Sequence, residues 1–148
     1  MITLAEIFME VSEYLKQYKD LNIYFAPDYE QENEVLAKFK NDNPHLSRNQ
    51  ISELKEILLS ESDIQDKYFV ADLLYLYPYF DQELFDPLID CAIAHKDPSF
   101  NRIFLRPCII SFGVEAVEKL LDEKGNNDNS LLEGINRLRY WLYIPVWE

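Results

Sequence analysis

Apolar residues recur every three or four positions along most of the chain, a spacing typical of amphipathic α-helices, and signals for strands are weak. Near the N-terminus, Thr3 and Glu6 have the spacing of a capping box before an apolar face, which predicts a helix over residues 4–19. Pro27 disfavours helix at the residue before it, so a connection is expected there, followed by a second helix over residues 28–41.

The capping-box spacing recurs at Ser47 with Gln50 and at Ser62 with Gln65, and each pair precedes an apolar run. The run after Ser62 is apolar nearly all round, which indicates a central helix over residues 63–77.

Helix boundaries in the second half of the chain follow from capping residues, prolines and glycines. We expect a helix capped by Asp81 that ends near Lys96, and then a helix capped by Ser99 that contains Pro107 and stops at Gly113. A short helix should follow and end at Gly125. The last helix should be capped by Ser130 with Glu133 and reach about Trp141. Residues 126–129, rich in asparagine, are the clearest loop.

These elements predict an all-α fold, a compact stack of α-α hairpins with about eight helices joined by short connections. The length predicts one helical domain over residues 1–148. Within it, residues 1–45 are expected to form an N-terminal cap or arm, and residues 47–148 a helical-repeat body.

Residues 63–96 and 99–124 are expected to form two such hairpins, and three segments within them carry a resemblance to a known family. They are Asp66–Leu74, the turn Tyr77–Phe80, and the helix with Pro107 ahead of Phe112 and Gly113. These segments resemble the HEAT-like α-helical repeat family, over about residues 63–124. The resemblance implies a short, curved solenoid that binds a partner, usually a protein, and that rarely holds an active site.

Acidic residues outnumber basic ones, with 27 Asp and Glu against 14 Lys and Arg, for a net charge of −13. This balance argues against general binding to nucleic acids or anionic membranes, because both need clustered Lys and Arg. The charge is uneven, since residues 1–34 hold eight acids against two bases, and residues 67–98 hold six against two. Such a field speeds association with a basic protein and weakens in salt.

The start of the chain lacks the basic segment and apolar core of a signal peptide, and no stretch approaches the roughly 18 apolar residues of a membrane span. We therefore expect a cytoplasmic protein. Its two cysteines, Cys91 and Cys108, are too few for a disulfide framework and are expected to be reduced core residues. Cys91 and His95 would offer half a zinc site, but only Cys108 and His45 remain as soft ligands, so no metal site is expected.

Motifs for catalysis are missing from the sequence. The three glycines cannot form a phosphate-binding loop, and neither a nucleophile elbow nor a protease Cys–His spacing occurs. Among 27 acids, an arbitrary pair of carboxylates carries little information. We expect no enzyme activity, no catalytic residue and no cofactor.

Asp72 is the only charged residue between Tyr68 and Phe80. A lone carboxylate in an apolar helix is costly to bury unless it is paired. In HEAT-like repeats an Asp and an Arg often bridge neighbouring repeats, so the resemblance implies a structural ion pair of Asp72 with Arg102 or Arg106. The alternatives are that Asp72 reaches solvent, or that it is a catalytic carboxylate with a raised pKa.

Aromatic residues make up 14% of the chain, ten of them tyrosines, and tyrosine suits both half-buried packing and interface anchors. Two turns combine aromatic with acidic residues, as a surface for a basic partner would. The expected partner-binding residues are Tyr24, Tyr29, Glu30, Glu32 and Glu34 at the first turn, and Tyr77, Tyr79, Asp81, Glu83 and Asp86 at the second.

Small size, acidity and these two turns favour a non-catalytic protein-binding module. The sharpest hypothesis is an immunity-type protein that neutralises a basic toxin or nuclease domain by covering its active site. Two alternatives stay open: a general adaptor or assembly scaffold whose acidity serves only solubility, and a HEAT-like DNA repair glycosylase. The last ranks lowest, because that resemblance implies a basic groove and the bases here are few and scattered.

Overall fold

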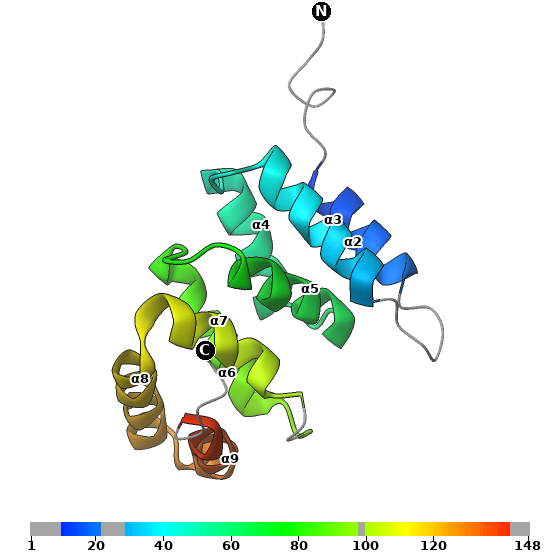
Figure 1. Cartoon of the computed structure of the whole chain (residues 1–148). Coiled ribbons are helices and arrows are strands. Elements are labelled where there is room, and N and C mark those ends of the chain that lie inside the picture. Colours follow the sequence, from blue (N-terminus) through cyan, green and yellow to red (C-terminus); the bar gives the residue numbers. More distant parts are fainter. Residues whose placement is uncertain (1–9, 22–28, 98–99, 143–148) are drawn as a thin grey trace, which may run out of the picture. The chain divides into compact units, whose positions relative to one another are not determined.

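The computed structural model describes residues 10–21, 29–97 and 100–142, and within residues 29–33 it describes the backbone alone. All regular structure in these ranges is helical, so the all-α prediction is confirmed. The α-helices are α2 (Val11–Asp20), α3 (Tyr29–Asp42), α4 (Arg48–Leu59), α5 (Ile64–Tyr75), α6 (Phe85–Ala94), α7 (Arg102–Phe112), α8 (Val114–Asn127) and α9 (Leu132–Leu142), with 3₁₀ turns η1 (Gln82–Leu84) and η2 (Asn129–Leu131) (Figure 1).

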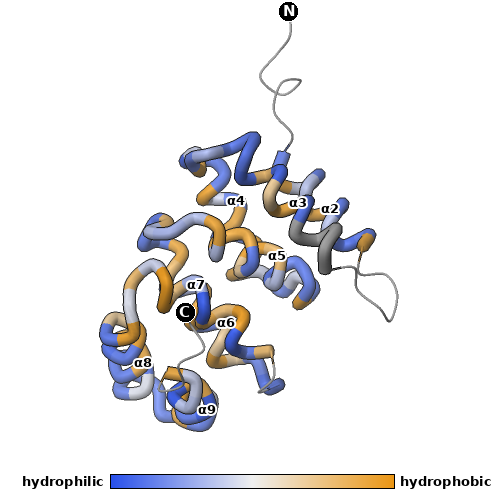
Figure 2. Tube along the Cα trace, viewed as in Figure 1, coloured by the Kyte–Doolittle hydropathy of each residue, from blue (hydrophilic) through white to orange (hydrophobic). Residues whose placement is uncertain are grey.

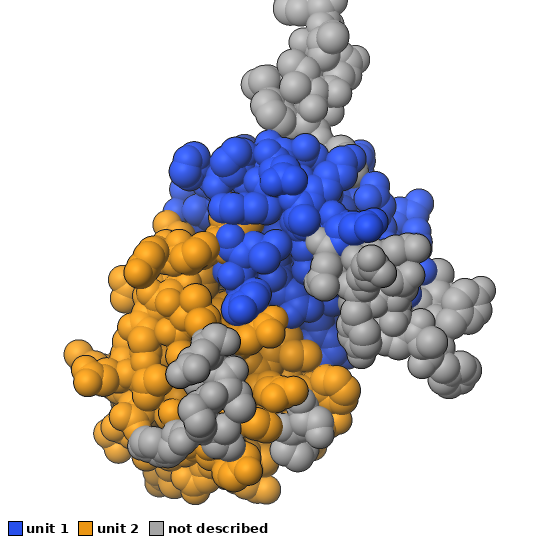
Figure 3. Space-filling view, viewed as in Figure 1, with its two compact units in different colours: residues 1–76 blue, residues 77–148 orange. Residues whose placement is uncertain are grey.

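The chain divides into two compact units, residues 1–76 and residues 77–148, which Figure 3 shows in different colours. The boundary expected near residue 46 therefore falls inside the first unit, and helices α2 and α3 share that unit with α4 and α5. None of the helices that the structure describes has the length and apolar character needed to cross a bilayer.

The core of the first unit is built around aromatic side chains. Helix α2 packs against α3, α4 and α5, and α5 also packs against α3 and α4. The Tyr14 and Phe39 rings meet edge-on at 4.6 Å, and Tyr18 and Phe69 do so at 5.4 Å. Both tyrosines also donate hydrogen bonds from their hydroxyls, and Tyr14 donates to Asp42 at 2.7 Å. The apolar face of α2 is therefore held by hydrogen bonds as well as by ring packing.

The core of the second unit forms around α6, which packs against α7, α9 and η1. This helix is strongly apolar and is coloured orange over much of its length in Figure 2, whereas α8 alternates between orange and blue. At Gly134, α9 approaches α6 so closely that a Cβ would lie 2.5 Å from the Ile93 carbonyl oxygen. Helix α8 closes the unit by packing against both α7 and α9.

Some predicted helix boundaries are confirmed. Ser47 and Gln50 form the full capping box at the start of α4, and Asp81 accepts the Glu83 amide at 2.8 Å before η1 and α6. Gly113, with φ of +89°, separates α7 from α8. Pro107 lies inside α7, as expected.

Other predicted boundaries are wrong in the first half of the chain. Glu10 has an extended backbone, so the helix expected over residues 4–19 does not run continuously, and α2 begins at Val11. The Thr3–Glu6 capping box lies outside the described residues. At α5 the N-cap is Asp63, because its carboxylate accepts the Gln65 amide, while the Ser62 hydroxyl donates instead to the Ile57 carbonyl.

In the second half, α8 does not end at Gly125 but continues to Asn127, so the expected loop over residues 126–129 is mostly helix and 3₁₀ turn. Gly125 is buried, and a Cβ there would touch the Leu132 and Ile135 side chains of α9. Gly125 therefore lies inside α8, against α9, and does not end the helix. The cap before η2 and α9 is Asp128, which accepts from the amide and hydroxyl of Ser130. The expected cap Ser99 lies outside the described residues, and Asn101 occupies the N-cap position of α7.

Candidate functional site

The Tyr79 turn, residues 77–83, places an aromatic side chain in solvent on a fixed backbone. Tyr79 is 82% exposed. Its φ of +64° lies in the left-handed region, and it is the sole described residue other than glycine with positive φ. That conformation costs about 1–2 kcal/mol for an L-residue with a side chain. The rest of the turn must therefore hold Tyr79 in place.

A hydrogen bond and a ring cluster provide that hold. The Tyr79 amide donates to the Ser111 hydroxyl at 3.0 Å, across to α7. Next to it, Phe80 meets Phe112 edge-on at 5.0 Å, and Phe85 stacks on Phe112 at 4.6 Å. Phe80, Phe85 and Ser111 are all buried, so the backbone that carries the exposed Tyr79 side chain is held by buried residues.

Tyr77, the other aromatic residue expected to contact a partner at this turn, is 6% exposed. Its ring belongs to the core of the second unit, and of the two expected tyrosines only Tyr79 reaches solvent. The sequence does not separate the two, because both stand in the same apolar-acidic run, Tyr-Pro-Tyr-Phe-Asp.

The three acids expected at this turn differ in their surroundings. Asp81 is exposed and caps η1, and Glu83 is half-buried. Asp86 lies against Lys124 of α8, which also forms an ion pair with Asp90 at 2.8 Å. Burial acts to lower the pKa of Lys124, but the hydrogen bonds and charges of Asp86 and Asp90 outweigh it and raise that pKa. The charge of Asp86 is therefore compensated within the molecule.

The first aromatic-acidic turn is only partly described. Tyr24 lies outside the described residues, and Tyr29, Glu30 and Glu32 lie on α3 at positions where the side chains are not described. Glu34 is exposed on the same helix. The role expected of this turn remains a prediction.

The predicted ion pair of Asp72 with Arg102 or Arg106 also remains a prediction. Asp72 is half-buried on α5 and accepts a hydrogen bond from the Tyr18 hydroxyl at 3.2 Å. Arg102 places its guanidinium 5.2 Å from the ring centroid of Trp141, a cation–π contact that sequence reasoning missed.

The cysteines and His95 sit in environments that do not favour reactivity. The Cys108 thiol is fully buried, which raises its pKa well above the ordinary value, and it points at the Phe104 carbonyl. A raised pKa keeps a thiol protonated and unreactive. Burial lowers the pKa of His95, and its Nδ1 accepts the Asp97 amide at 3.1 Å. Among the residues that the structure describes, no three His, Cys, Asp or Glu side chains gather as metal ligands.

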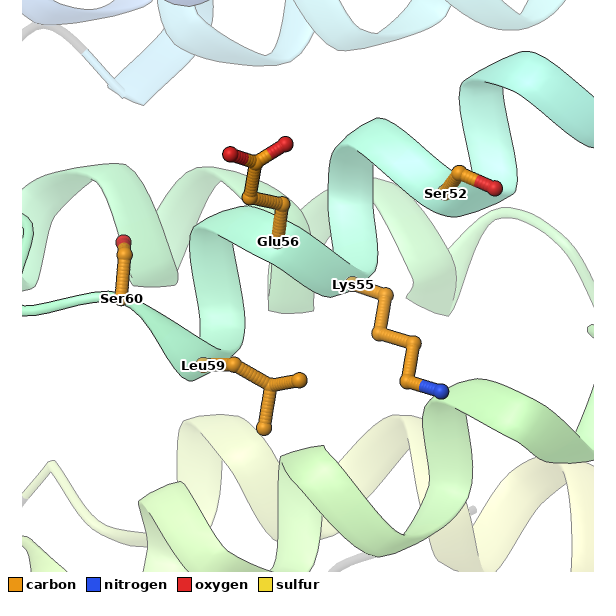
Figure 4. A pocket seen from close by; sticks show the side chains of 5 residues that line it. All are labelled: Ser52, Lys55, Glu56, Leu59 and Ser60. Carbon is orange, nitrogen blue, oxygen red and sulfur yellow. The ribbon is translucent and has the colours of Figure 1, made fainter.

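A surface hollow beside α4 lacks the features of a reaction site. It is lined by residues of one helix and its C-cap, namely Ser52, Lys55, Glu56, Leu59 and Ser60 (Figure 4). In Figure 4, Glu56 points away from the side of the helix on which Lys55 and Leu59 lie. Because the charged groups do not converge, the hollow offers no arrangement for acid–base chemistry.

Comparison of the chain with models of known protein families, with curated proteins and with solved structures finds no match in any of the three. Sequence reasoning identified Tyr79 but missed Ser111, which fixes the turn from 32 positions away. A polar residue directly after the apolar run Pro107–Ile110 was the available signal.

Proposed function

We propose that this chain is a non-catalytic protein-binding module that docks a basic protein through the Tyr79 turn. The observation that carries the proposal is the exposed Tyr79 ring on a backbone fixed by Ser111 and the Phe80–Phe112 cluster. A backbone that is already fixed lowers the conformational entropy that this residue loses on binding, and tyrosine is enriched among binding hot spots. Strained backbone conformations also gather at functional positions.

The acids around Tyr79 support a basic partner. Asp81 and Glu83 lie within four residues of the ring, and the chain as a whole carries a charge of −13. Long-range attraction of this sign steers a cationic protein toward the surface and raises the association rate. Asp86 contributes less to this attraction, because Lys124 compensates its charge.

We assign the partner to the class of basic toxin or nuclease domains, which the chain would neutralise by covering the active site. Small size and strong acidity support this assignment, since a nuclease that binds phosphates presents a cationic surface. A general adaptor would share the exposed tyrosine but would not depend on the acids.

The test is affinity capture with the full chain, followed by kinetics on the purified complex. Tyr79→Asn removes the ring but suits the left-handed backbone, since asparagine tolerates positive φ. Asp81→Asn with Glu83→Gln removes the charges while keeping side-chain size. Tyr140→Phe is the matched control, because Tyr140 is 66% exposed on α9, outside the turn.

We expect Tyr79→Asn to weaken binding at least tenfold, as for a hot-spot residue worth about 2 kcal/mol. The charge variant should slow association, and salt should do the same to the unmodified chain. Tyr140→Phe should change neither. An acidic partner, or binding unaffected by salt and by Asp81→Asn, would favour the adaptor, and activity of the partner in the complex would contradict neutralisation.

A further inference from the structure

A chain of hydrogen bonds links three helices of the second unit through the connection between α6 and α7. The His95 Nδ1 atom, at the C-cap of α6, accepts the Asp97 amide at 3.1 Å. The Asp97 carbonyl accepts the Asn101 amide at 3.0 Å, and the Asn101 side-chain oxygen accepts the Trp141 indole N–H at 2.9 Å. Asn101 is fully buried at the N-cap position of α7, and Trp141 lies on α9. The His95 ring is therefore coupled to a contact between α7 and α9.

The first bond in this chain requires a neutral His95. An imidazole nitrogen accepts a hydrogen bond through its lone pair, so the proton of neutral His95 lies on Nε2. In the charged imidazolium both ring nitrogens carry protons, and the Asp97 amide would then face a second donor. Protonation of His95 therefore removes its bond to the Asp97 amide.

The surroundings of His95 favour its neutral form in the folded chain. The residue is half-buried, and its ring centroid lies 6.0 Å from that of Phe104, an uncharged residue of α7. Burial lowers the pKa of His95 and the charge of Asp97 raises it, and burial has the larger effect. The closed arrangement therefore takes up a proton at lower pH than a fully solvated histidine does.

The charged groups nearby offer the protonated ring a second partner. The Asp97 carboxylate can accept a hydrogen bond from the protonated Nδ1. Lys96 follows His95 in the chain but is exposed, so water screens its charge. On α9, Glu133 and Arg137 line a surface hollow together with Lys96, and they pair with each other at 3.5 Å. The connection thus has two arrangements, in which Nδ1 bonds either the Asp97 amide or the Asp97 carboxylate.

We propose that His95 is a pH-sensitive switch, which holds the connection between α6 and α7 at neutral pH and releases it in mild acid. Because burial lowers the pKa of His95 in the closed arrangement, the open arrangement gains its proton first as the pH falls through about 6.5. Release of the Asp97 amide then weakens the bonds of Asn101 and Trp141. A switch needs a titratable group and an element with two arrangements, and His95 and this connection supply them. The switch is independent of the proposed partner-binding function.

The test follows hydrogen exchange of the full chain by NMR at about pH 7.5 and about pH 5.5, on either side of the ordinary histidine pKa. Exchange rates are corrected for the intrinsic effect of pH. His95→Asn keeps an acceptor for the Asp97 amide, because asparagine bonds the backbone two residues on, but it does not titrate. His95→Ala removes the acceptor. His45→Asn is the matched control, since His45 is exposed and lies in the first unit. Circular dichroism verifies that each variant is folded.

We expect protection of the Asp97 and Asn101 amides and of the Trp141 indole to fall at least about twofold at the lower pH, with the same midpoint as the His95 ring signals. His95→Asn should keep this protection at both pH values, His95→Ala should lack it at both, and His45→Asn should behave as the unmodified chain. Unchanged protection, an equal fall in His95→Asn, or a fall at Asp97 that does not extend to Asn101 and Trp141 would each overturn the inference.

Discussion

At the scale of single residues, Tyr79 combines a strained backbone with an exposed side chain. Its left-handed backbone costs about 1–2 kcal/mol, and its ring, 82% exposed, buries too little apolar surface to offset that cost. Selection for stability alone favours glycine at such a position, because glycine adopts positive φ without strain. An exposed ring on a strained backbone therefore supports the partner contact that we propose for Tyr79.

Replacing Tyr79 by glycine should stabilise the protein, and it should also abolish the partner contact that we propose. Relief of strain is offset in part by the greater freedom of glycine in the unfolded chain, which leaves a gain of about 0.5–1 kcal/mol in the free energy of unfolding. Urea unfolding measures the gain. Tyr79→Ala keeps the strain and serves as the control, so equal stability of the glycine and alanine variants would argue against this account.

Tyr14 gives the stability a dependence on pH. Burial, then the hydrogen bond to Asp42 and its charge, raise the pKa of Tyr14 to about 12. In the unfolded chain a tyrosine ionises near pH 10, so between about pH 10 and 12 the unfolded state loses a proton that the folded state retains. The stabilisation is complete below this window and is lost as the pH rises through it.

Tyr14→Phe should remove this part of the alkaline loss. At neutral pH the variant should lose about 1 kcal/mol with its hydrogen bond, a small penalty because Asp42 is exposed and regains water. Urea unfolding below and above the tyrosine range measures both effects. A Tyr14→Phe profile as steep as that of the unmodified chain would refute the assignment.

At the scale of elements, local patterns located the helices better than their ends. The Ser47–Gln50 box was found because it has no nearby competitor, whereas Ser62 stands beside Asp63 and Ser130 close to Asp128. Serine and aspartate are almost equally good caps, so the choice depends on where the chain turns. Likewise, nothing local distinguishes a glycine that ends a helix from Gly125, which lies inside α8 and faces α9.

The two helical glycines should respond to alanine with opposite signs. At Gly134 a Cβ would lie 2.5 Å from the Ile93 carbonyl oxygen, backbone that cannot move without separating α6 from α9, so Gly134→Ala should cost about 1–3 kcal/mol. At Gly125 the nearest atoms are the side-chain ends of Leu132 and Ile135, at 3.1 and 3.3 Å. These can shift, and the helix propensity of alanine returns up to about 1 kcal/mol. Thermal unfolding of the two variants compares them directly, and loss of equal size in both would contradict this picture of the α6–α9 contact.

At the scale of the molecule, periodicity was enough to predict an all-α chain, and composition was enough to locate acidic and aromatic segments. Neither separates Tyr77, in the core, from Tyr79, in solvent, because exposure depends on contacts such as the one with Ser111, far away in the sequence. The ion pair of Asp86 with Lys124 could not be predicted from the sequence for the same reason, since 38 positions separate the two residues. Local patterns are therefore enough to predict the fold class, whereas exposure and charge pairing at the candidate site depend on long-range contacts.

The division after Leu76 predicts two cooperative units in place of one. Each unit has its own fully buried side chains, among them Leu54 in the first and Leu138 in the second. Replacing either leucine by alanine should cost about 2–5 kcal/mol within its unit. Native-state hydrogen exchange should then show Leu54→Ala lowering amide protection in α2–α5 and leaving α6–α9 unchanged, with the reverse for Leu138→Ala. Equal loss of protection throughout the chain would instead support the single domain that length alone predicts, because in one cooperative unit every core amide exchanges through the same global opening.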